Sequence, residues 1–402
     1  MVPISQAVIL CGGIGSRLGV LTATTPKPLL PVAGRPFLER LMFEIKRHGP
    51  RRFLLLAAHL SEELERFASQ TASLLNIEVK VCVEPGRAGT GGALWHARHE
   101  LDARFFLFNG DSWFDINLLD LALMQAQSPG SVLAMALRPL EDARRFGIVE
   151  LDQGRVTRFG DHDGRPGPAL VNGGVYVVSH RLVDHLSADC SLERDVLKPL
   201  AAAAATAICG RVYDRFFIDI GIPPDYERAQ DAVPAQQRRP AVFFDRDGVL
   251  NADHGYVGHM ARFDWLPGAI SAIKSINDLG YFAFVVTNQA GVAKGHYSEA
   301  DVQLLHNQIQ AALATTGAHI DDFRYCPFHP EGSVVAYARV SDWRKPAPGM
   351  LLDLLAHWPV DVSASIMIGD QPSDVQAGES AGMRAQLVRS GENVGQMLAQ
   401  ML

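Results

Sequence analysis

Residues 6–18 read QAVILCGGIGSRL, an apolar run that passes directly into a glycine-rich turn. Residues 241–251 read AVFFDRDGVLN, a second apolar run that passes into two acidic residues. Each pattern is typical of a buried strand in an α/β fold, where ligands bind at the carboxyl ends of the strands. The sequence therefore predicts two sheets, each with its own phosphate-handling site.

Short apolar runs alternate with amphipathic segments through the first part of the chain. Strands are expected at 7–10, 53–57, 79–83, 105–108 and 132–137, and helices at 37–47, 61–70 and 92–100. Two strand-rich stretches, 148–159 and 169–178, favour an antiparallel addition at the sheet edge, and the alanine run 201–205 favours a helix surface. Residues 233–240, VPAQQRRP, are polar and bounded by prolines, which indicates a linker.

The alternation restarts after the linker. Strands are expected at 241–244, 281–287, 323–326, 365–368 and 385–388, and helices at 268–279, 298–315, 349–357 and 373–381. The fold class is therefore α/β, with two Rossmann-like three-layer domains at 1–232 and 241–402. We expect a mixed sheet in the first domain and a parallel sheet in the second.

Composition sets limits on the partners and the compartment. The chain has 402 residues, 48% of them apolar and 20% charged, which fits two globular domains. A formal net charge of -7 gives no reason to expect nucleic acid or an anionic membrane as a partner. The five cysteines are scattered, and no apolar stretch reaches the length of a membrane span or follows a basic start. These features predict a reduced, cytoplasmic protein that acts on small molecules.

The loop after the first strand suits a nucleotide. Gly12, Gly13 and Gly15 let backbone amides approach phosphate oxygens, and Arg17 can offer a forked donor. A Walker loop would need Gly-Lys-Ser/Thr, and a dinucleotide fingerprint would need a third glycine where Leu18 stands. From this loop alone, a phosphate cradle and a structural tight turn are equally good interpretations.

Later segments favour the cradle. Lys27 stands between two prolines, so its ammonium group can be aimed at a phosphate, although a solvated loop lysine is the plainer alternative. Residues 84–92, EPGRAGTGG, offer exposed amides for the edge of a base. Asp111 follows an apolar strand, and together with Asp219 it can hold one Mg²⁺ on a triphosphate. Alone, each aspartate would more often be a cap or a turn residue.

The segments GGIGSRL, TPKPLLPV, GTGGAL, NGDS, NGGVYV and FIDIGIPPDY, in this order, resemble the sugar-1-phosphate nucleotidyltransferase family over nearly all of residues 1–232. The resemblance implies attack of a sugar 1-phosphate on the α-phosphorus of a nucleoside triphosphate, with pyrophosphate leaving. It implies phosphate binding by Arg17 and Lys27 and metal binding by Asp111 and Asp219. The nucleotide would be bound by Gly12, Gly13, Gly15, Ser16, Glu84, Gly89, Thr90, Asn109 and Gly110, and the sugar by Asn172, Gly173 and Glu193.

The second site has two carboxylates with divided roles. Asp245 follows a strand directly and can attack phosphorus, while Asp247 can protonate the leaving oxygen and then activate water. Two ionised acids beside a phosphate call for a divalent cation, for which Asp370, after another apolar strand, is a further ligand. We expect Mg²⁺ on Asp245, Asp247 and Asp370.

Three other groups complete this prediction. Thr287 and Asn288 follow a third strand and can donate hydrogen bonds to the phosphoryl group, and Lys345 can offset its charge. Any one of these residues alone is as well explained by a turn at a strand end. The full set resembles the haloacid dehalogenase-like phosphatases over roughly residues 241–390.

More narrowly, DRDGVLN, DHGYVG, TNQAGVAKG, CPFHPEG and RKPAPGM are similar to the D-glycero-D-manno-heptose 1,7-bisphosphate and histidinol phosphatases, which implies substrate binding by Arg344. Those relatives commonly carry a zinc loop, but here only Cys326 remains of its ligands. Phe328, Ser341 and Trp343 stand at the other three positions. We expect no zinc there, and apolar packing of the loop instead. Gln371 is a second departure, because the heptose enzymes often have lysine at that position.

Together the two resemblances imply a bifunctional enzyme. A heptose bisphosphatase would supply heptose 1-phosphate to a guanylyltransferase that uses GTP, with Mg²⁺ in both domains. Two alternatives stay open at this point: a different sugar or nucleotide for the transferase, and a regulatory role for the phosphatase-like half. Nucleotidyltransferases of this kind often associate, so a homo-oligomer is a further expectation.

Overall fold

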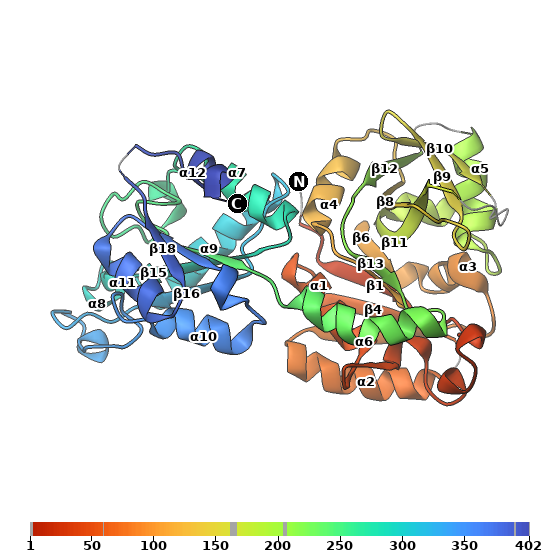
Figure 1. Cartoon of the computed structure of the whole chain (residues 1–402), viewed down its shortest axis with the longest axis horizontal. Coiled ribbons are helices and arrows are strands. Elements are labelled where there is room, and N and C mark those ends of the chain that lie inside the picture. Colours follow the sequence, from red (N-terminus) through yellow and green to blue (C-terminus); the bar gives the residue numbers. More distant parts are fainter. Residues whose placement is uncertain (1–2, 59, 161–166, 204–206, 390, 402) are drawn as a thin grey trace. The chain divides into compact units, whose positions relative to one another are not determined.

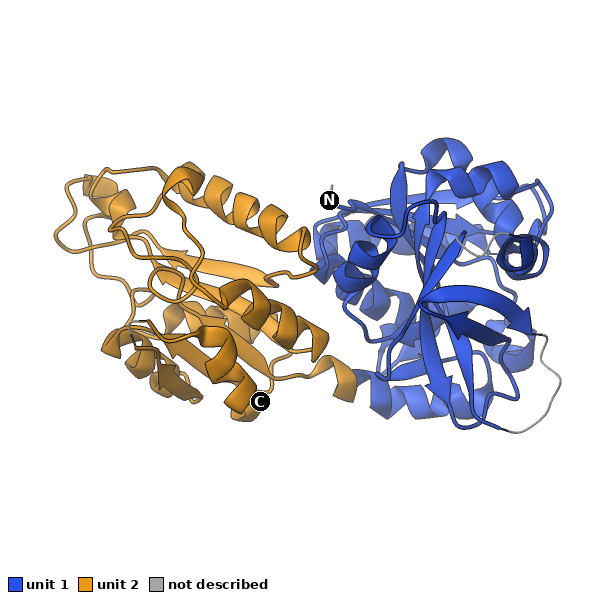
Figure 2. Cartoon of the chain, turned by 90° about the horizontal axis from the view of Figure 1, so that it is seen from above, with its two compact units in different colours: residues 1–234 blue, residues 235–402 orange. Residues whose placement is uncertain are grey.

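The computed structural model describes residues 3–58, 60–160, 167–203, 207–389 and 391–401. The chain divides into two compact units, Met1–Pro234 and Ala235–Leu402 (Figure 2). Each unit is an α/β structure with its own sheet. Within the described ranges, no helix combines the length and the apolar character that crossing a membrane requires.

Unit 1 is built on a mixed nine-stranded sheet (Figure 1). Parallel strands lie on one side of it, and β11 runs antiparallel to both of its neighbours, β6 and β8. The hairpin of β9 and β10 closes one edge, as expected for 148–159, but the other stretch expected at the edge, 169–178, is β11 inside the sheet. In sheet order the strands are β5 (Glu78–Val83), β4 (Arg52–Ala57), β1 (Gln6–Leu10), β6 (Arg104–Asn109), β11 (Ala169–Ser179), β8 (Leu133–Leu140), β12 (Ile208–Val212), β10 (Arg155–Gly160) and β9 (Ile148–Asp152).

Two pairs of short strands lie outside this sheet, and one of them matters for the site. The pair β7 (Ser112–Phe114) and β13 (Phe217–Asp219) sets Asp219 opposite Ser112. The other pair is β2 (Pro31–Val32) and β3 (Arg35–Pro36). The helices are α1 (Phe37–Arg47), α2 (Ser61–Leu75), α3 (Gly89–His96), α4 (Leu118–Ala126), α5 (Lys198–Ala203) and α6 (Pro223–Gln237). Segments of 3-10 helix occur at Ser16–Thr22, Lys27–Leu29, Arg98–Glu100 and His180–His185, and a π-helix at Leu192–Leu197.

The alanine run is helical where the structure describes it, as expected, whereas the linker differs from the expectation. Ala201 to Ala203 belong to α5, whereas residues 204 and 205 of the run lie outside the described residues. The linker expected at 233–240 is helical over its first half, because α6 continues through Pro234 to Gln237. Val233 and Gln237 are buried, and they lie four residues apart on one helix face. This burial outweighs the break that the proline suggests.

Unit 2 has a five-stranded sheet in which every pairing is parallel. In sheet order its strands are β16 (Asp322–Cys326), β15 (Phe282–Asn288), β14 (Ala241–Phe244), β17 (Ile366–Gly369) and β18 (Arg384–Leu387). The helices are α7 (Ala269–Asp278), α8 (Ala290–Ala293), α9 (Glu299–Ala314), α10 (Gly349–His357), α11 (Pro372–Ser380) and α12 (Val394–Met401), with 3-10 turns at Met260–Arg262, Val335–Tyr337 and Val362–Ala364.

Alternate side chains of the central strand β14 enter two different apolar cores. Val242 and Phe244 pack in one core, and Ala241 and Phe243 pack in the other. A strand that is buried on both faces reads as a continuous apolar run, which is why AVFF could be recognised as a strand. Its carboxyl end leads directly to Asp245.

Candidate active sites

The glycine loop after β1 borders a cavity of about 390 Å³ in unit 1. A Cβ atom at Gly12 would lie 3.2 Å from Ala58 and 3.3 Å from Glu84, and Gly15 has a φ of 69° that favours glycine. A Cβ at Gly13 would meet nothing within 4 Å, so that position faces open space. Gly12 and Gly13 line the cavity, as do Glu84, Gly89, Thr90, Asn109 and Asp111.

Lys27 lies next to Asp111, one of the residues that line this cavity. It is buried, and its Nζ atom forms an ion pair with Asp111 and lies 3.8 Å from Asp219. A Cβ at Gly221 would lie 2.7 Å from Lys27 Nζ and 3.1 Å from Arg17 Nη2, so only glycine allows both cations to approach this point. The structure therefore brings Arg17, Lys27, Asp111 and Asp219 together.

The two carboxylates of this group share one buried lysine as their cationic partner. Burial raises the pKa of Asp219, and repulsion from Asp111 raises it further, while Lys27 opposes the shift. The Gly221 amide donates a hydrogen bond of 2.6 Å to Asp219 and fixes one of its oxygens. Asp111, in the turn before β7, and Asp219, at the end of β13, are two acids that could hold a divalent ion, and Lys27 supplies positive charge beside them.

Glu84 also lines this cavity, and one of its carboxylate oxygens has no hydrogen-bond donor among the described residues. This atom, Oε2, is buried. Burial raises the pKa of the carboxyl group, while the Ala88 amide and the charge of His96 lower it. A buried acceptor without a donor costs free energy until a ligand supplies one. Glu84 is thus placed to accept hydrogen bonds from a bound base.

The predicted sugar-binding residues come together beside β11. Asn172 donates hydrogen bonds of 2.6 Å to Tyr176 and 2.5 Å to Glu193, so two of the predicted sugar-binding residues are in direct contact. Gly173 lies so close to Phe114 that a Cβ atom would collide with the ring. Thr90 accepts a hydrogen bond of 3.0 Å from the Leu192 amide, which joins the glycine-rich segment at α3 to the π-helix that carries Glu193.

Asn109 and Gly110 follow β6 and lie against the carboxyl end of β1. Asn109 pairs with Leu10 in the sheet, and the Gly110 amide donates a 3.0 Å hydrogen bond to the Leu10 carbonyl. A Cβ at Gly174, which has a φ of 71°, would lie 2.7 Å from Asn109 Nδ2. The second glycine of NGGVYV is therefore required by the asparagine of NGDS, a relation that links two separate motifs.

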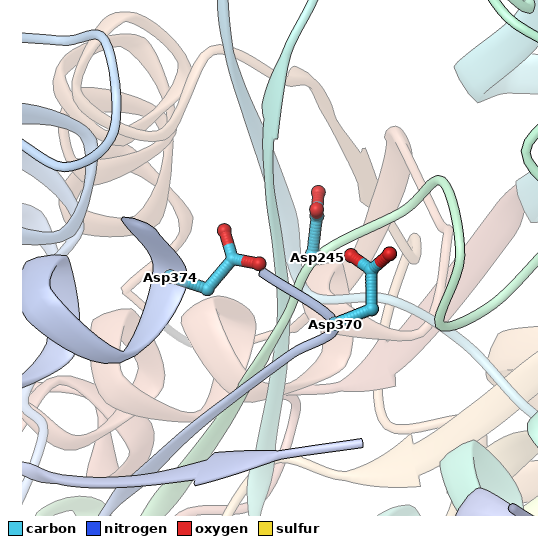
Figure 3. Close-up of side chains that lie close together, drawn as sticks. All are labelled: Asp245, Asp370 and Asp374. Atoms are coloured by element: carbon cyan, nitrogen blue, oxygen red, sulfur yellow. The ribbon is translucent and has the colours of Figure 1, made fainter. Parts of the chain in front are cut away.

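The second site lies in a cavity of about 430 Å³ in unit 2. Asp245, Asp370 and Asp374 come from the ends of β14 and β17 and from the first turn of α11, and they point toward one another (Figure 3). Oxygen atoms of the three carboxylates lie within 4.8 Å of one another. The Oδ1 atom of Asp370 is buried and accepts no hydrogen bond from the described residues, which fits a cation at this point.

Lys345 neutralises part of this acidic group. Its Nζ atom lies 2.8 Å from Asp245 and 2.7 Å from Asp374, and it also donates to the Val286 carbonyl. Burial raises the pKa of Asp245, which Lys345 opposes. Burial works against the charged lysine, but attraction from the two acids raises its pKa overall. Sequence reasoning missed Asp374, whose signal was its position four residues after Asp370 at a helix start.

Asp247 lies outside the group of three carboxylates, although it was expected among the metal ligands. Its oxygens accept hydrogen bonds of 2.9 Å from Arg246, 2.9 Å from Asn251 and 3.0 Å from Gln289. Arg246 is fully buried. The Tyr297 hydroxyl donates a 2.7 Å hydrogen bond to the Gln289 side chain and so fixes the amide that contacts Asp247. Asp247 still lines the cavity, so it can exchange a proton with a bound substrate.

Thr287 and Asn288 line the same cavity at the end of β15. Thr287 is buried and accepts a 2.8 Å hydrogen bond from Gln289. Asn288 exchanges two hydrogen bonds of 3.1 Å with the backbone of Lys345. Asn288 was expected to bind the phosphoryl group, and its side chain also holds the backbone segment that carries Lys345.

Arg344 and the loop with the altered zinc positions lie beside this cavity. The Nη1 atom of Arg344 is buried without a hydrogen-bond partner among the described residues. Phe328 and Trp343 pack against the apolar core next to Cys326, as the sequence predicts. The hydroxyl groups of Tyr325 and Tyr337, on opposite sides of the loop, both donate 2.8 Å hydrogen bonds to Glu299.

Both units match known families. The nucleotidyl transferase family matches residues 6–236, and the HAD-hydrolase-like family matches residues 342–401. Unit 2 is similar to curated phosphatases of heptose bisphosphates. The D-glycero-beta-D-manno-heptose-1,7-bisphosphate 7-phosphatase of Rhodopseudomonas palustris is 51% identical over 146 residues, which are 36% of this chain and 81% of that protein.

Two further relatives of unit 2 differ in the sugar anomer that they are named for. The beta-anomer 7-phosphatase of Escherichia coli K12 is 41% identical over 156 residues, 39% of this chain and 82% of that protein. The D-glycero-alpha-D-manno-heptose-1,7-bisphosphate 7-phosphatase of Burkholderia mallei is 43% identical over 148 residues, 37% of this chain and 78% of that protein.

Solved structures resemble unit 1. The crystal structure of HddC from Yersinia pseudotuberculosis is 28% identical with a TM-score of 0.50, and the match covers 57% of this chain and 99% of that one. The same protein complexed with GMP-PN is 29% identical, with the same TM-score and the same coverage of both chains.

Proposed function

The chain belongs to the nucleotidyl transferase family through its first unit and to the heptose-1,7-bisphosphate 7-phosphatase family through its second, and we propose that the two units catalyse consecutive steps. Unit 2 removes the 7-phosphate of D-glycero-D-manno-heptose 1,7-bisphosphate. Unit 1 joins the resulting heptose 1-phosphate to GMP from GTP and releases pyrophosphate. The observation that carries this proposal is the buried arrangement of Asp245, Lys345 and Asp374 in a chain that also has the Lys27 site.

In unit 2, Asp245 attacks the phosphorus of the 7-phosphate, and the bond from phosphorus to the sugar oxygen breaks. Asp247 gives its proton to that oxygen, then takes a proton from the water that hydrolyses the aspartyl phosphate. Lys345 holds Asp245 in place and balances the negative charge. Mg²⁺ bound by Asp245 and Asp370 would screen the carboxylates from the phosphate and stabilise charge in the transition state.

In unit 1, an oxygen of the sugar 1-phosphate attacks the α-phosphorus of GTP, and the bond to the pyrophosphate breaks. Arg17 and Lys27 stabilise the charge on the phosphates, and the glycine loop positions them through its amides. Asn172 and Glu193 are close enough to share hydrogen bonds with one sugar. Asp111 and Asp219 are the ligands that would hold Mg²⁺, which neutralises the triphosphate when it is bound.

Glu84 supports GTP as the nucleotide. A carboxylate only accepts hydrogen bonds, and guanine offers two adjacent donors, the N1 imino and the 2-amino groups. Adenine and cytosine present a ring nitrogen acceptor there instead, which would leave the buried Oε2 atom of Glu84 without a donor. The solved relative that holds GMP-PN is consistent with this choice.

All five cysteines are free thiols, which supports a cytoplasmic location.

The test is a paired assay on one purified protein with Mg²⁺. Phosphate release is measured on the alpha and beta anomers of heptose 1,7-bisphosphate, since relatives are named for each. Pyrophosphate release is measured over a grid of nucleoside triphosphates and sugar 1-phosphates. Asp245→Asn is expected to stop only the first reaction, and Asp111→Ala only the second. The proposal fails if heptose phosphates support neither reaction, or if either variant stops both.

A further inference from the structure

Gln371 is the second departure of unit 2 from the heptose phosphatases, and it takes no part in the proposed reaction. It stands where those phosphatases often have lysine, directly after Asp370 and before α11. Its side chain is exposed and lines the phosphatase cavity. A neutral amide at this position therefore changes the charge beside the group of three carboxylates.

The cavity around Gln371 is strongly acidic. Its lining contains five aspartates: Asp245, Asp247, Asp253, Asp370 and Asp374. Among the described residues that line it, Lys345 is the one cationic side chain, and its ammonium group is already paired with Asp245 and Asp374. An anionic substrate needs further positive charge there, and carboxylate oxygens favour a hard divalent cation as its source.

The oxygen atoms of the three carboxylates differ in their partners (Figure 3). Asp374 accepts from Lys345 at 2.7 Å on Oδ1 and from the backbone amide of Gln371 at 3.0 Å on Oδ2. Oδ1 of Asp245 lies 2.8 Å from the Nζ atom of Lys345. Oδ2 of Asp370 accepts a 2.9 Å hydrogen bond from the side-chain amide of Gln371, whereas its buried Oδ1 has no donor among the described residues. A cation can therefore bind Oδ1 of Asp370 without displacing a hydrogen bond.

Two neighbours hold the Asp370 carboxylate in this orientation. The amide of Gln371 fixes Oδ2. The backbone at Gly248 approaches so closely that a Cβ atom there would lie 2.4 Å from Oδ2 and 3.1 Å from Oδ1. The carboxylate therefore cannot turn freely between them. An amide donates a hydrogen bond as a lysine would, but it carries no charge and so does not repel a divalent ion on the other oxygen.

We infer that Gln371 is a positioning residue for the cation ligand Asp370: its neutral amide occupies Oδ2 and leaves Oδ1 to the divalent ion. The inference rests on the proposed function, in which a divalent ion assists the phosphatase reaction of unit 2. Gln371 touches no reacting atom in this arrangement and acts through Asp370. Partners of this kind orient metal ligands and contribute to the affinity for the metal.

The test measures binding of Mn²⁺, which takes the same oxygen ligands as Mg²⁺, by calorimetry. The parent is the full chain with Asp111→Ala, so that the acids of unit 1 do not contribute, and Asp370→Asn in this parent should remove the site. Gln371→Met deletes the donor, and Gln371→Lys keeps a donor but adds a charge. Each is expected to weaken Mn²⁺ binding about tenfold or more. Gln376→Met, exposed on α11 and outside the cavity, is the matched control and should change binding by less than about twofold.

Either Gln371 variant binding Mn²⁺ within about twofold of the parent would overturn the inference, and so would equal weakening by Gln376→Met or a site that survives Asp370→Asn. A parent that binds no Mn²⁺ would overturn it too. The bond from Gln371 to Asp374 comes from the backbone, so the start of α11 stays intact in the variants, and urea denaturation should show equal stability. Because the titration needs no substrate, the expected binding without phosphate release from heptose phosphates would count against the proposed function alone.

Discussion

The Nζ atom of Lys345 lies 2.8 Å from Oδ1 of Asp245, and both side chains are buried at the carboxyl end of the unit 2 sheet. The same ammonium group pairs with Asp374 at 2.7 Å. One lysine therefore compensates two buried carboxylates, one of which is the predicted nucleophile. Stability and catalysis are coupled at this point, because the charge that positions the nucleophile also allows the acids to be buried.

Replacing Lys345 by methionine should damage both properties. Two uncompensated carboxylates would remain in the interior, and we expect unit 2 to lose about 3–5 kcal/mol of unfolding free energy. Phosphate release should be abolished. Urea denaturation of the full chain and a phosphate assay measure the two effects. A second variant, Lys345→Met with Asp374→Asn, should recover part of the stability but none of the activity. Equal stabilities of the two variants would contradict this account.

Gly248→Ala tests the approach of the backbone to Asp370. A Cβ atom at Gly248 would collide with the Asp370 carboxylate, so the side chain must move away from the predicted metal site. We expect phosphate release to fall by roughly tenfold or more while nucleotidyl transfer is unchanged. Gly382→Ala is the matched control, because Gly382 also has a positive φ but a Cβ there meets nothing within 4 Å. A similar loss of activity in both variants would show that backbone strain alone is responsible.

Glu84→Gln should relax the choice of nucleotide. The amide places an NH₂ donor where guanine presents its own donors, so one hydrogen bond is lost and two donors face each other. The ratio of kcat/KM for GTP to that for ATP is expected to fall at least tenfold, about 1.4 kcal/mol. Initial rates of pyrophosphate release with each nucleotide give this ratio. Glu78→Gln, an exposed position at the start of β5 and outside the cavity, should leave the ratio unchanged.

The loop that carries Phe328 should keep its structure without zinc. Phe328 and Trp343 pack on the core, and two tyrosine hydroxyls donate to Glu299, so the loop has contacts that need no metal. We expect less than about 0.1 zinc per chain by mass spectrometry, since a single cysteine cannot build a tetrahedral site. Prolonged chelation followed by Mg²⁺ should restore full phosphatase activity. Stoichiometric zinc would show that ligands outside this loop complete a site.

The sequence predicts most of the long strands, because they are buried on both faces and appear as continuous apolar runs, but β12 and the short strands β7 and β13 were not expected. The predicted strand 241–244 and helix 349–357 coincide with β14 and α10. The sequence does not predict which side chains contact one another in the site. The place of Asp374 in the site depends on the direction in which α11 leaves β17. Gln289 donates a hydrogen bond to Asp247 while it accepts one from the Tyr297 hydroxyl. Neither relation leaves a periodic signal along the chain.

His306 should make the stability of unit 2 depend on pH. The imidazole is buried against Phe323, its Nε2 atom has no hydrogen-bond partner among the described residues, and burial lowers its pKa to about 3. The unfolded chain has a pKa near 6.5 at this position, so it binds more protons than the folded chain between these two values. The stabilisation is complete above pH 6.5 and is lost as the pH falls toward 3. At pH 5 the loss is about 2 kcal/mol.

His306→Phe keeps the ring stack but cannot titrate. Between pH 7.5 and pH 5, the unfolding free energy of the wild type should therefore fall by that amount relative to the variant. Parallel pH profiles in urea denaturation would mean that the histidine does not titrate in this way.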